Sequence, residues 1–246
     1  MKIKSITLIL TILLYISFAS SAQELLPTST TGEIVKHTYY TLSYSEKDEQ
    51  AEWVFYILTS EMLNGKQKRT NDFRQDTLIT SISAQPLDYK HSGYDLGHLC
   101  PAQDMKLNKT SMSESFLISN MSPQKPSFNR GIWKKLEAKV RKWAITEGRI
   151  YVVTGGVLTS NKGKIGVDGV SIPKYFYKII YDPNGKGKMI ALLLPNEKGR
   201  NPLQTYMVSV DSVESLTGID FFHELPDSIE NRLESTKDVS SWSFHK

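Results

Sequence analysis

A turn-rich stretch at residues 92–105 reads SGYDLGHLCPAQDM and contains His98, the one histidine of five that lies among small, turn-forming and acidic residues. Gly93 and Gly97 permit backbone conformations that side chains disfavour. Asp95 is close enough in sequence to orient an imidazole or to fix the loop. Taken alone, a histidine flanked by Asp and Gly is more often a loop residue than a catalytic one. The stretch nominates His98, and the surrounding sequence has to decide its role.

Two further segments follow His98 along the chain. Residues 119–124 read SNMSPQ and residues 128–137 read FNRGIWKKLE, which places Asn120 and Asn129 at 22 and 31 residues beyond the histidine. This ordered pattern resembles the DNA/RNA non-specific endonucleases, a secreted and mitochondrial family with a ββα-metal active site and an Asp-Arg-Gly-His signature. The resemblance covers about residues 50–195 and includes Arg69, Phe73, Asp76, Thr154-Gly155-Gly156 and Ile172-Pro173.

The resemblance implies a role for each matched residue. His98 is the general base that removes a proton from the attacking water, and an imidazole suits this task because its ordinary pKa of about 6.5 is near neutral pH; Asp95 could bias that pKa further. Asn129 is the single direct protein ligand of Mg²⁺, with Mn²⁺ as a substitute, because Mg²⁺ keeps most of its water shell. Asn120 helps to order the site, although by itself it is equally a turn residue.

Glu137 is implied to hold a metal-bound water. On an ideal helix the eight residues from Asn129 to Glu137 span about 12 Å along the axis, which is too far for both to bind one ion side by side. The contact to the metal is therefore expected through water. The alternative is a surface glutamate that pairs with Lys134 or Arg141.

Positive charge concentrates around these motifs. Arg69 resembles the arginine that braces the scissile phosphate, a task that suits a planar guanidinium; the alternative is a solvated loop charge beside Lys66 and Lys68. Lys134 and Arg141 are predicted to contact the substrate, although a solvated helix face would carry the same charges. The full basic group is Lys106, Lys109, Lys125, Arg130, Lys134, Lys135, Lys139, Arg141 and Lys142. No motif for reading bases is visible, so cleavage is expected to depend on backbone phosphates and groove shape.

One position departs from the family signature. Leu96 stands where the family has Arg, so a phosphate-contacting cation is missing, a loss on the order of 1–3 kcal/mol. Two alternatives therefore stay open: a catalytically weak protein that binds nucleic acid or other polyanions, and a phosphodiesterase for a different diester. Cys100 could be read as a nucleophile, but no second histidine stands nearby in sequence, and a small buried hydrophobe is favoured.

Composition sets few limits on the partner. The 246 residues are 39% hydrophobic and 23% charged, which is enough apolar material for a folded chain. Thirty Lys and Arg against 26 Asp and Glu give a net charge of +4. Without Lys2 and Lys4 the balance is 28 − 26 = +2, too even to name a partner. The single cysteine excludes an internal disulfide and a Cys-rich metal site, so any metal must use oxygen or imidazole ligands.

Residues 1–22 have the pattern of a secretory signal. Lys2 and Lys4 precede an apolar run at 6–18, and Ser20-Ser21-Ala22 offers small residues to a signal peptidase. An uncleaved anchor is disfavoured because an apolar run of about 13 residues is short of the roughly 20 that span a membrane. We expect cleavage after Ala22 and a secreted or periplasmic product that is not held by a membrane. Residues 23–34 are interpreted as a linker, and 35–246 as a single nuclease domain with a less certain tail from about 226.

The remaining pattern predicts an α+β fold. Aromatic and β-branched runs predict strands at 37–44, 53–58, 116–121, 149–154, 175–181 and 189–194, the last two as a hairpin. A helix is expected at 129–144, where Trp133, Leu136, Val140 and Trp143 share one face, and another at 208–218. Residues 66–76 are expected to form a charged loop. Because strands and helices do not alternate strictly, a doubly wound sheet is disfavoured. The resemblance implies a ββα-metal fold whose central, mostly antiparallel sheet is flanked by helices.

Overall fold

The computed structural model describes residues 25–80 and 83–244. The expected signal segment at residues 1–22 therefore lies outside the described residues. Among the described helices, none combines the length and the apolar character needed to cross a lipid bilayer.

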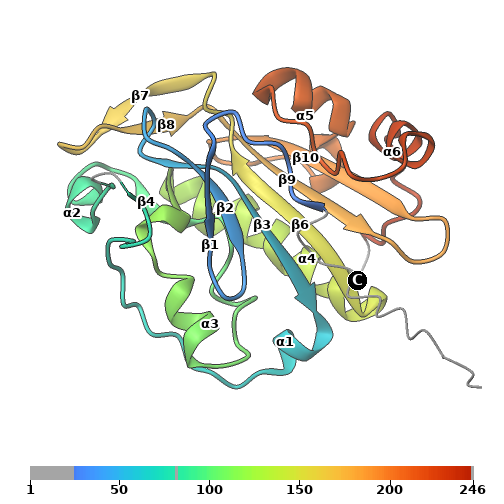
Figure 1. Cartoon of the computed structure of the whole chain (residues 1–246), viewed down its shortest axis with the longest axis horizontal. Helices are drawn as coiled ribbons and strands as arrows, with labels where there is room; N and C mark the ends of the chain where they lie inside the picture. The colour runs from blue at the N-terminus through green and yellow to red at the C-terminus, as the bar shows by residue number, and fades with distance from the viewer. Residues whose placement is uncertain (1–24, 81–82, 245–246) are drawn as a thin grey trace, which may run out of the picture.

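A seven-stranded sheet forms the centre of the molecule (Figure 1). Its strand order is β1-β2-β3-β6-β9-β10-β11, and every neighbouring pair is antiparallel. The strands are β1 Glu33–Lys36, β2 Thr41–Ser45, β3 Gln50–Thr59, β6 Arg149–Gly156, β9 Tyr175–Asp182, β10 Lys188–Pro195 and β11 Met207–Val208. The continuous apolar run predicted at 53–58 lies within β3, which is paired on both edges, as expected for a strand covered on both faces.

Helices and two small ladders surround the sheet. The ladders are β4 Asp95–His98 with β5 Met121–Gln124, and β7 Asn161–Ile165 with β8 Val170–Pro173. The α-helices are α1 Ser60–Asn64, α2 Pro86–Tyr89, α3 Lys109–Glu114, α4 Lys134–Glu147, α5 Val210–Thr217 and α6 Asp227–Glu234. The π-helical turn is η3 Phe128–Trp133, and the 3₁₀ turns are η2 Ile118–Asn120 and η4 Leu203–Tyr206. The combination confirms the α+β class.

The two faces of the sheet bury different sets of side chains. Alternate residues of β3 point to opposite faces, so Val54 and Tyr56 join one core, whereas Trp53 and Phe55 join the other. The first core includes the apolar stripe of α4, which consists of Leu136, Val140, Trp143 and Ala144. The second includes apolar residues of α5 and α6, namely Val210, Val213 and Leu233. The sheet thus separates α4 from α5 and α6.

Most predicted elements are present, but the bounds of two predicted strands are wrong. The 175–181 and 189–194 runs form the β9–β10 hairpin, and the 208–218 segment is α5 with Gly218 in the left-handed conformation at its end. The strand predicted at 37–44 begins only at Thr41, because residues 37–40 form the turn between β1 and β2, where the amide of His37 bonds to the carbonyl of Tyr40. The strand predicted at 116–121 begins only at Met121, because η2 precedes it.

Both ends of the described chain contact the sheet. Residues 25–34, interpreted above as a linker, include Leu25 and Leu26 packed against the second core, and the carbonyl of Thr28 accepts a bond from the indole of Trp53. At the other end, the segment from 226 onward contributes α6 and the buried side chain of Trp242. These segments add contacts to the sheet that neither composition nor periodicity indicated.

Candidate active site

The β4–β5 ladder positions His98. His98 pairs with Met121 and Gly97 pairs with Ser122 in antiparallel register. A Cβ at position 97 would lie 2.2 Å from Cδ of Gln124, so only glycine leaves room for that side chain. The requirement at Gly97 is therefore close packing, whereas Gly93 has the positive φ, 82°, that the sequence suggested for both glycines.

His98 is 9% exposed and lies among aromatic rings. The Phe116 and Phe73 rings meet the imidazole edge to face, with centroid distances of 5.1 Å and 5.8 Å. Burial, followed by the positive charge of Arg69, lowers the pKa of His98 to about 3. Its Nε2 atom is buried without a hydrogen-bond partner among the described residues. His98 is thus neutral at neutral pH, the protonation state that a general base requires.

Asp95 binds the following motif instead of His98. Its Oδ2 accepts hydrogen bonds from Nδ2 of Asn129 and from Nε of Arg130, both at 2.9 Å, and its Oδ1 accepts from Nη2 of Arg130 at 2.6 Å. The expectation that Asp95 orients or tunes the imidazole is wrong. Residues three apart on a strand point to opposite faces, so Asp95 and His98 of β4 face away from each other.

Asn129 lies in the π-helical turn η3, which leads from β5 into α4. Inside η3, Gly131 has the non-helical angles φ −106° and ψ −109°, so the chain is kinked between Asn129 and Glu137. The straight helix expected over 129–144 is therefore wrong at its first turn. Extra-residue turns of this kind often occur at functional sites. The kink invalidates the ideal-helix estimate of the separation between these two side chains.

One cavity of about 480 Å³ brings together six of the seven predicted site residues. Its lining consists of Arg69, Leu96, His98, Pro101, Ala102, Gln103, Asn129, Arg130, Lys134, Glu137 and Arg141. On α4, Lys134, Glu137 and Arg141 are three and four residues apart and so share one face. The candidate general base, both candidate metal-binding side chains and all three predicted phosphate contacts thus line the same cavity.

A buried ionic group lies behind the α4 residues. Burial raises the pKa of Glu137 to about 7, while Lys178 opposes the rise. Lys178 is fully buried, and its Nζ lies 5.0 Å from the centroid of the Trp133 ring and 3.4 Å from the carbonyl oxygen of Leu99. Arg141 donates to buried Asp104 across 2.9 Å. Arg141 is therefore anchored by a carboxylate while it lines the cavity.

Arg69 extends from the loop predicted at 66–76. Its guanidinium carbon lies 4.6 Å from the centroid of Phe116, the same ring that meets His98, and its Nε donates to Oδ1 of Asn71 across 2.6 Å. A cation held over an aromatic face keeps its charge and loses conformational freedom. The aromatic ring therefore fixes the arginine and the histidine relative to each other.

Asn120 does not line the cavity. It is fully buried, and its side-chain amide accepts from the backbone amide of Cys100 and donates to the carbonyls of Cys100 and Ser115. These bonds hold the backbone two residues beyond His98. The structure thus places Asn120 as a positioning residue, and it buries Cys100 completely.

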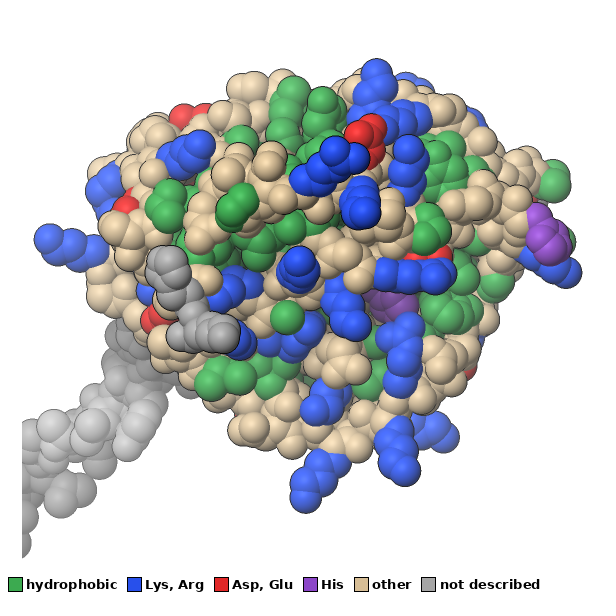
Figure 2. Space-filling view, turned by 180° about the vertical axis from the view of Figure 1, so that it is seen from behind, with side chains coloured by type: hydrophobic (Ala, Val, Ile, Leu, Met, Phe, Trp, Pro, Cys, Tyr) green, Lys and Arg blue, Asp and Glu red, His purple; other side chains and the backbone are tan. Residues whose placement is uncertain are grey.

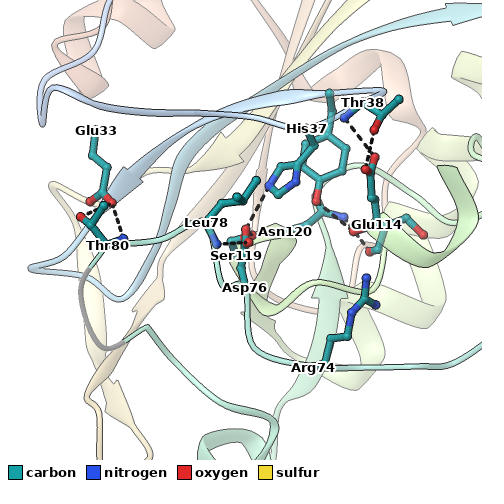
Figure 3. Close-up of polar contacts among 12 residues, drawn as sticks. Glu33, His37, Thr38, Arg74, Asp76, Leu78, Thr80, Glu114, Ser119 and Asn120 are labelled. Carbon is teal, nitrogen blue, oxygen red and sulfur yellow. Dashed lines mark hydrogen bonds and ion pairs between the residues drawn. The ribbon is translucent and has the colours of Figure 1, made fainter. Parts of the chain in front are cut away.

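A second buried network steadies the loop that carries Arg69 (Figure 3). Nε2 of His37 lies 3.0 Å from Oδ2 of Asp76, which also accepts a bond from Oγ of Ser119 at 2.5 Å. The amide of Leu78 donates to the other oxygen of Asp76. The network connects the β1–β2 turn, the loop and η2, which explains why Asp76 belongs to the upstream motif although it lies outside the cavity lining.

Lys and Arg side chains gather over the side of the molecule seen from behind in Figure 2. The predicted basic group divides into parts. Arg130, Lys134 and Arg141 line the cavity. Lys139, in contrast, donates to the carbonyl of Phe244 in the C-terminal segment and so serves a structural contact. The basic residues thus have different surroundings, and their contact with a polyanion stays a prediction.

Sequence reasoning missed three contributors to this site. Lys178 had a signal, since it is a lysine inside an otherwise apolar strand, but nothing local indicated its partners. Arg130 was counted only as part of a basic group, and Asp104 only as part of the histidine stretch. The roles of Arg130 and Asp104 depend on contacts between residues that lie far apart in the sequence. Arg130 contacts Asp95 and Asp104 contacts Arg141, each across 35 residues or more.

A family model and several known proteins match this chain, and all of them are described as nucleases. The model of the DNA/RNA non-specific endonuclease family matches residues 19–228. The chain is 34% identical over 212 residues to a nuclease of Nostoc sp., covering 81% of this chain and 76% of that protein. It is 32% identical over 214 residues to nuclease C1 of Cunninghamella echinulata var. echinulata, covering 80% and 85%. Human mitochondrial endonuclease G is 30% identical over 198 residues, covering 74% and 67%.

A solved structure extends the match to three dimensions. The chain superimposes on a structure described as the EndoG/EndoGI complex with a TM-score of 0.73 at 32% sequence identity, covering 79% of this chain and 87% of the other. The β4–β5 ladder followed by η3 and α4 is the ββα unit of this fold, so the predicted architecture is confirmed.

Proposed function

The chain belongs to the DNA/RNA non-specific endonuclease family, and from this premise we propose that it is a secreted or periplasmic, Mg²⁺-dependent enzyme in which His98 activates the attacking water. One observation carries the proposal. The neutral imidazole of His98 lines the same cavity as Asn129, Glu137 and Arg69, and its buried Nε2 has no hydrogen-bond partner within the described part of the chain. A base without a competing hydrogen bond, next to cationic and oxygen ligands, suits phosphodiester hydrolysis.

The donor set of the cavity fits Mg²⁺. Because Nδ2 of Asn129 donates to Asp95, the amide is held in one orientation with Oδ1 as its remaining ligand atom. Glu137 adds carboxylate oxygens. Because burial raises the pKa of Glu137, a cation beside it would stabilise its charged form. Oxygen donors in small number suit an ion that retains most of its waters, and Mn²⁺ would fit the same donors. When bound, the ion would neutralise negative charge that develops on the phosphate.

The side chains of the cavity divide the remaining work. His98 accepts the proton of the water that attacks phosphorus. Arg69 and Arg141 place positive charge where the phosphate oxygens become more negative, and the Phe116 ring and Asp104 respectively hold these arginines in place. Lys134, which is exposed at the rim, attracts the flanking backbone. Asn120 holds the backbone of Cys100, two residues after His98, without touching substrate.

Cleavage of DNA and of RNA with little sequence preference follows from the same lining. The polar contacts available are mostly cationic and so suit phosphates, which carry no sequence information. Leu96 removes one such cation from the family pattern. Arg130 lines the same cavity and is fixed by Asp95, the residue directly before Leu96, so it supplies a guanidinium near this corner.

The location of the protein rests on residues 1–22 alone. Their basic start, apolar run and small residues before position 23 support export followed by cleavage. Several matched relatives are named as mitochondrial proteins, which is a different subcellular location. Fractionation of cells that express the full chain, with amino-terminal sequencing of the product, tests this part: a mature chain that starts at Gln23 is expected, and an unprocessed cytoplasmic chain would contradict it.

The central experiment incubates the mature chain with supercoiled plasmid and with single-stranded RNA, in Mg²⁺ or EDTA. We expect nicking and then complete degradation only with wild type and Mg²⁺, and loss of cleavage in His98→Ala and Asn129→Ala. His91→Asn is the matched control, because His91 is an exposed histidine with positive φ, which Asn tolerates. Plasmid that stays intact in Mg²⁺, Mn²⁺ and Ca²⁺ would remove the nuclease assignment. Retained binding would then indicate a polyanion-binding protein, and turnover of small diesters alone would indicate a different phosphodiesterase.

A further inference from the structure

Three carboxylates converge where α5 meets α6. Asp211 and Glu214 lie three residues apart on α5, and Glu234 is the last residue of α6. One carboxylate oxygen from each lies within 4.8 Å of the other two. This group is called the α5–α6 carboxylate cluster below. Three like charges at this separation repel one another, so the arrangement needs a compensating interaction.

Glu234 distinguishes the cluster from an ordinary acidic surface. Glu234 is 5% exposed, and its Oε1 is buried with no hydrogen-bond partner among the described residues. Buried polar groups in folded proteins are nearly always hydrogen-bonded, and buried charges are paired or coordinate metals. A buried carboxylate with an unpartnered oxygen, close to two further carboxylates, points to a cation as the missing partner.

We propose that the α5–α6 carboxylate cluster binds a hard divalent cation, with Ca²⁺ as the preferred ion. Carboxylate oxygens are hard ligands, and Ca²⁺ accepts several of them in irregular geometry at about 2.3–2.6 Å. Two oxygens on opposite sides of such an ion are about 4.8 Å apart, so the observed spacing is within reach of a single Ca²⁺. Mg²⁺ fits less well because it usually takes one or two carboxylates and keeps its waters.

The three side chains leave coordination sites for the ion. One oxygen of Glu214, Oε1, accepts a hydrogen bond from the amide of Phe221, which fixes the side chain and leaves Oε2 available. Asp211 is exposed in the first turn of α5, so water can complete the shell from that side. Two more carboxylates, Asp220 and Glu230, add to the negative potential at Glu234. The site thus combines one rigid, one buried and one solvent-facing ligand.

The cluster is separate from the active-site cavity. The apolar residues of α5 and α6 pack on the opposite face of the central sheet from those of α4, and Figure 1 shows the two helices side by side at one end of the molecule. An ion held by both helices would clip α6 to α5 over the second core. Its expected effect is therefore on stability, with the chemistry at His98 left unchanged.

Protonation of Glu234 is the competing way to remove the repulsion. Burial and the neighbouring carboxylates raise the pKa of Glu234 to about 9, so a proton would occupy the group when no cation is present. The protonated and the cation-bound states differ in a measurable way. Only cation binding makes the unfolding temperature depend on Ca²⁺ concentration.

Calorimetric titration and thermal unfolding of the mature chain carrying Asn129→Ala test the proposal, since that substitution removes the active-site ligand. We expect one Ca²⁺ equivalent to bind, and Tm to rise by roughly 5–10 °C at a Ca²⁺ concentration one hundred times the Kd. Mg²⁺ should produce a smaller shift at equal concentration. Added Glu234→Gln, Glu214→Gln or Asp211→Asn should each weaken Ca²⁺ binding on the order of tenfold or more.

Glu230→Gln is the matched control, because it removes a neighbouring negative charge and leaves the three ligands intact. It should change Ca²⁺ affinity much less than Glu234→Gln. Asp211→Asn keeps the test decisive if a buried substitution fails to fold, because Asp211 is exposed. In the otherwise unaltered chain, Glu234→Gln should leave plasmid cleavage in Mg²⁺ unchanged. A Tm and a heat of titration that do not respond to Ca²⁺, or an equal loss of affinity in Glu230→Gln, would overturn the site.

Discussion

The side-chain amide of Asn129 donates a hydrogen bond to the carboxylate of Asp95 across 2.9 Å, so the first residue of β4 fixes the candidate metal ligand on η3. His98, at the other end of the same short strand, lies in the same cavity as Asn129. One four-residue strand therefore sets the position of the candidate base directly and that of the candidate metal ligand through a hydrogen bond. Asp95 is accordingly a positioning residue.

Replacing Asp95 with Asn should lower metal affinity and activity by about 10–100-fold, the usual cost of losing a partner that orients a ligand. The Mg²⁺ dependence of kcat/KM measures the effect, and saturating Mg²⁺ should restore part of the rate. Asp227→Asn, which alters an exposed carboxylate on α6, serves as the control. An unchanged Mg²⁺ requirement in Asp95→Asn would contradict the positioning role.

The lowered pKa of His98 predicts a pH dependence of stability. The folded-state pKa is about 3, whereas an exposed histidine titrates near 6.5, so the unfolded chain binds more protons between these values. Stability is therefore fully present above about pH 6.5 and is lost as pH falls toward 3. Urea unfolding between pH 4 and 7.5 should show a flatter dependence in His98→Asn than in wild type, with His91→Asn unchanged from wild type. Equal slopes in His98→Asn and wild type would show that His98 is not buried in its neutral form.

Arg69 should lose function in a graded way. Arg69→Ala is expected to lower kcat on the order of 10²–10³-fold, similar to the loss of a donor that stabilises transition-state charge. Arg69→Lys should recover only part of the rate, because an ammonium keeps the charge but lacks the planar guanidinium that packs on Phe116. Lys68→Ala, one residue away, is the control and should stay near wild type. Full activity in Arg69→Ala would show that Arg69 is a solvated loop residue without a role in cleavage.

Leu96 and Arg130 should behave as a linked pair. If Arg130 supplies the guanidinium that the family pattern has at position 96, Arg130→Ala should raise KM for plasmid more than Lys135→Ala, which removes an exposed cation outside the cavity lining. Leu96→Arg should restore affinity in the Arg130→Ala background and add little to wild type. Independent effects of the two substitutions in this double-mutant comparison would show that the two positions do not share a task.

Lys178 should be needed for the stability of the region behind Glu137. Lys178→Met removes a buried cation and leaves Asp104 and Glu137 with less compensation, which typically costs about 3–5 kcal/mol. Chemical denaturation measures the loss. Lys174→Met, an exposed lysine next to the same strand, is the control. A Lys178→Met chain as stable as wild type would mean that the carboxylates are neutralised without it.

The sequence was informative where a local pattern coincides with a local structure. The apolar run in β3, the β9–β10 hairpin and the buried stripe of α4 follow from periodicity, and six of the seven site residues predicted from the sequence line the cavity. The partner of Asp95 could not be foreseen, because it depends on which face of β4 each residue occupies. The kink at Gly131 was equally hidden, since the sequence before Lys134 has the same apolar spacing as a regular helix.

Two neighbouring positions in β4 differ in the amino acids that they tolerate. At Gly97 a Cβ would collide with the buried side chain of Gln124, which would have to move, whereas the partly buried side chain at 96 borders the cavity. Substitution is therefore expected to be better tolerated at position 96 than at 97. The strand can thus alter how the enzyme engages different polymers without endangering the alignment of its base, which makes position 96 the natural starting point for engineering substrate preference.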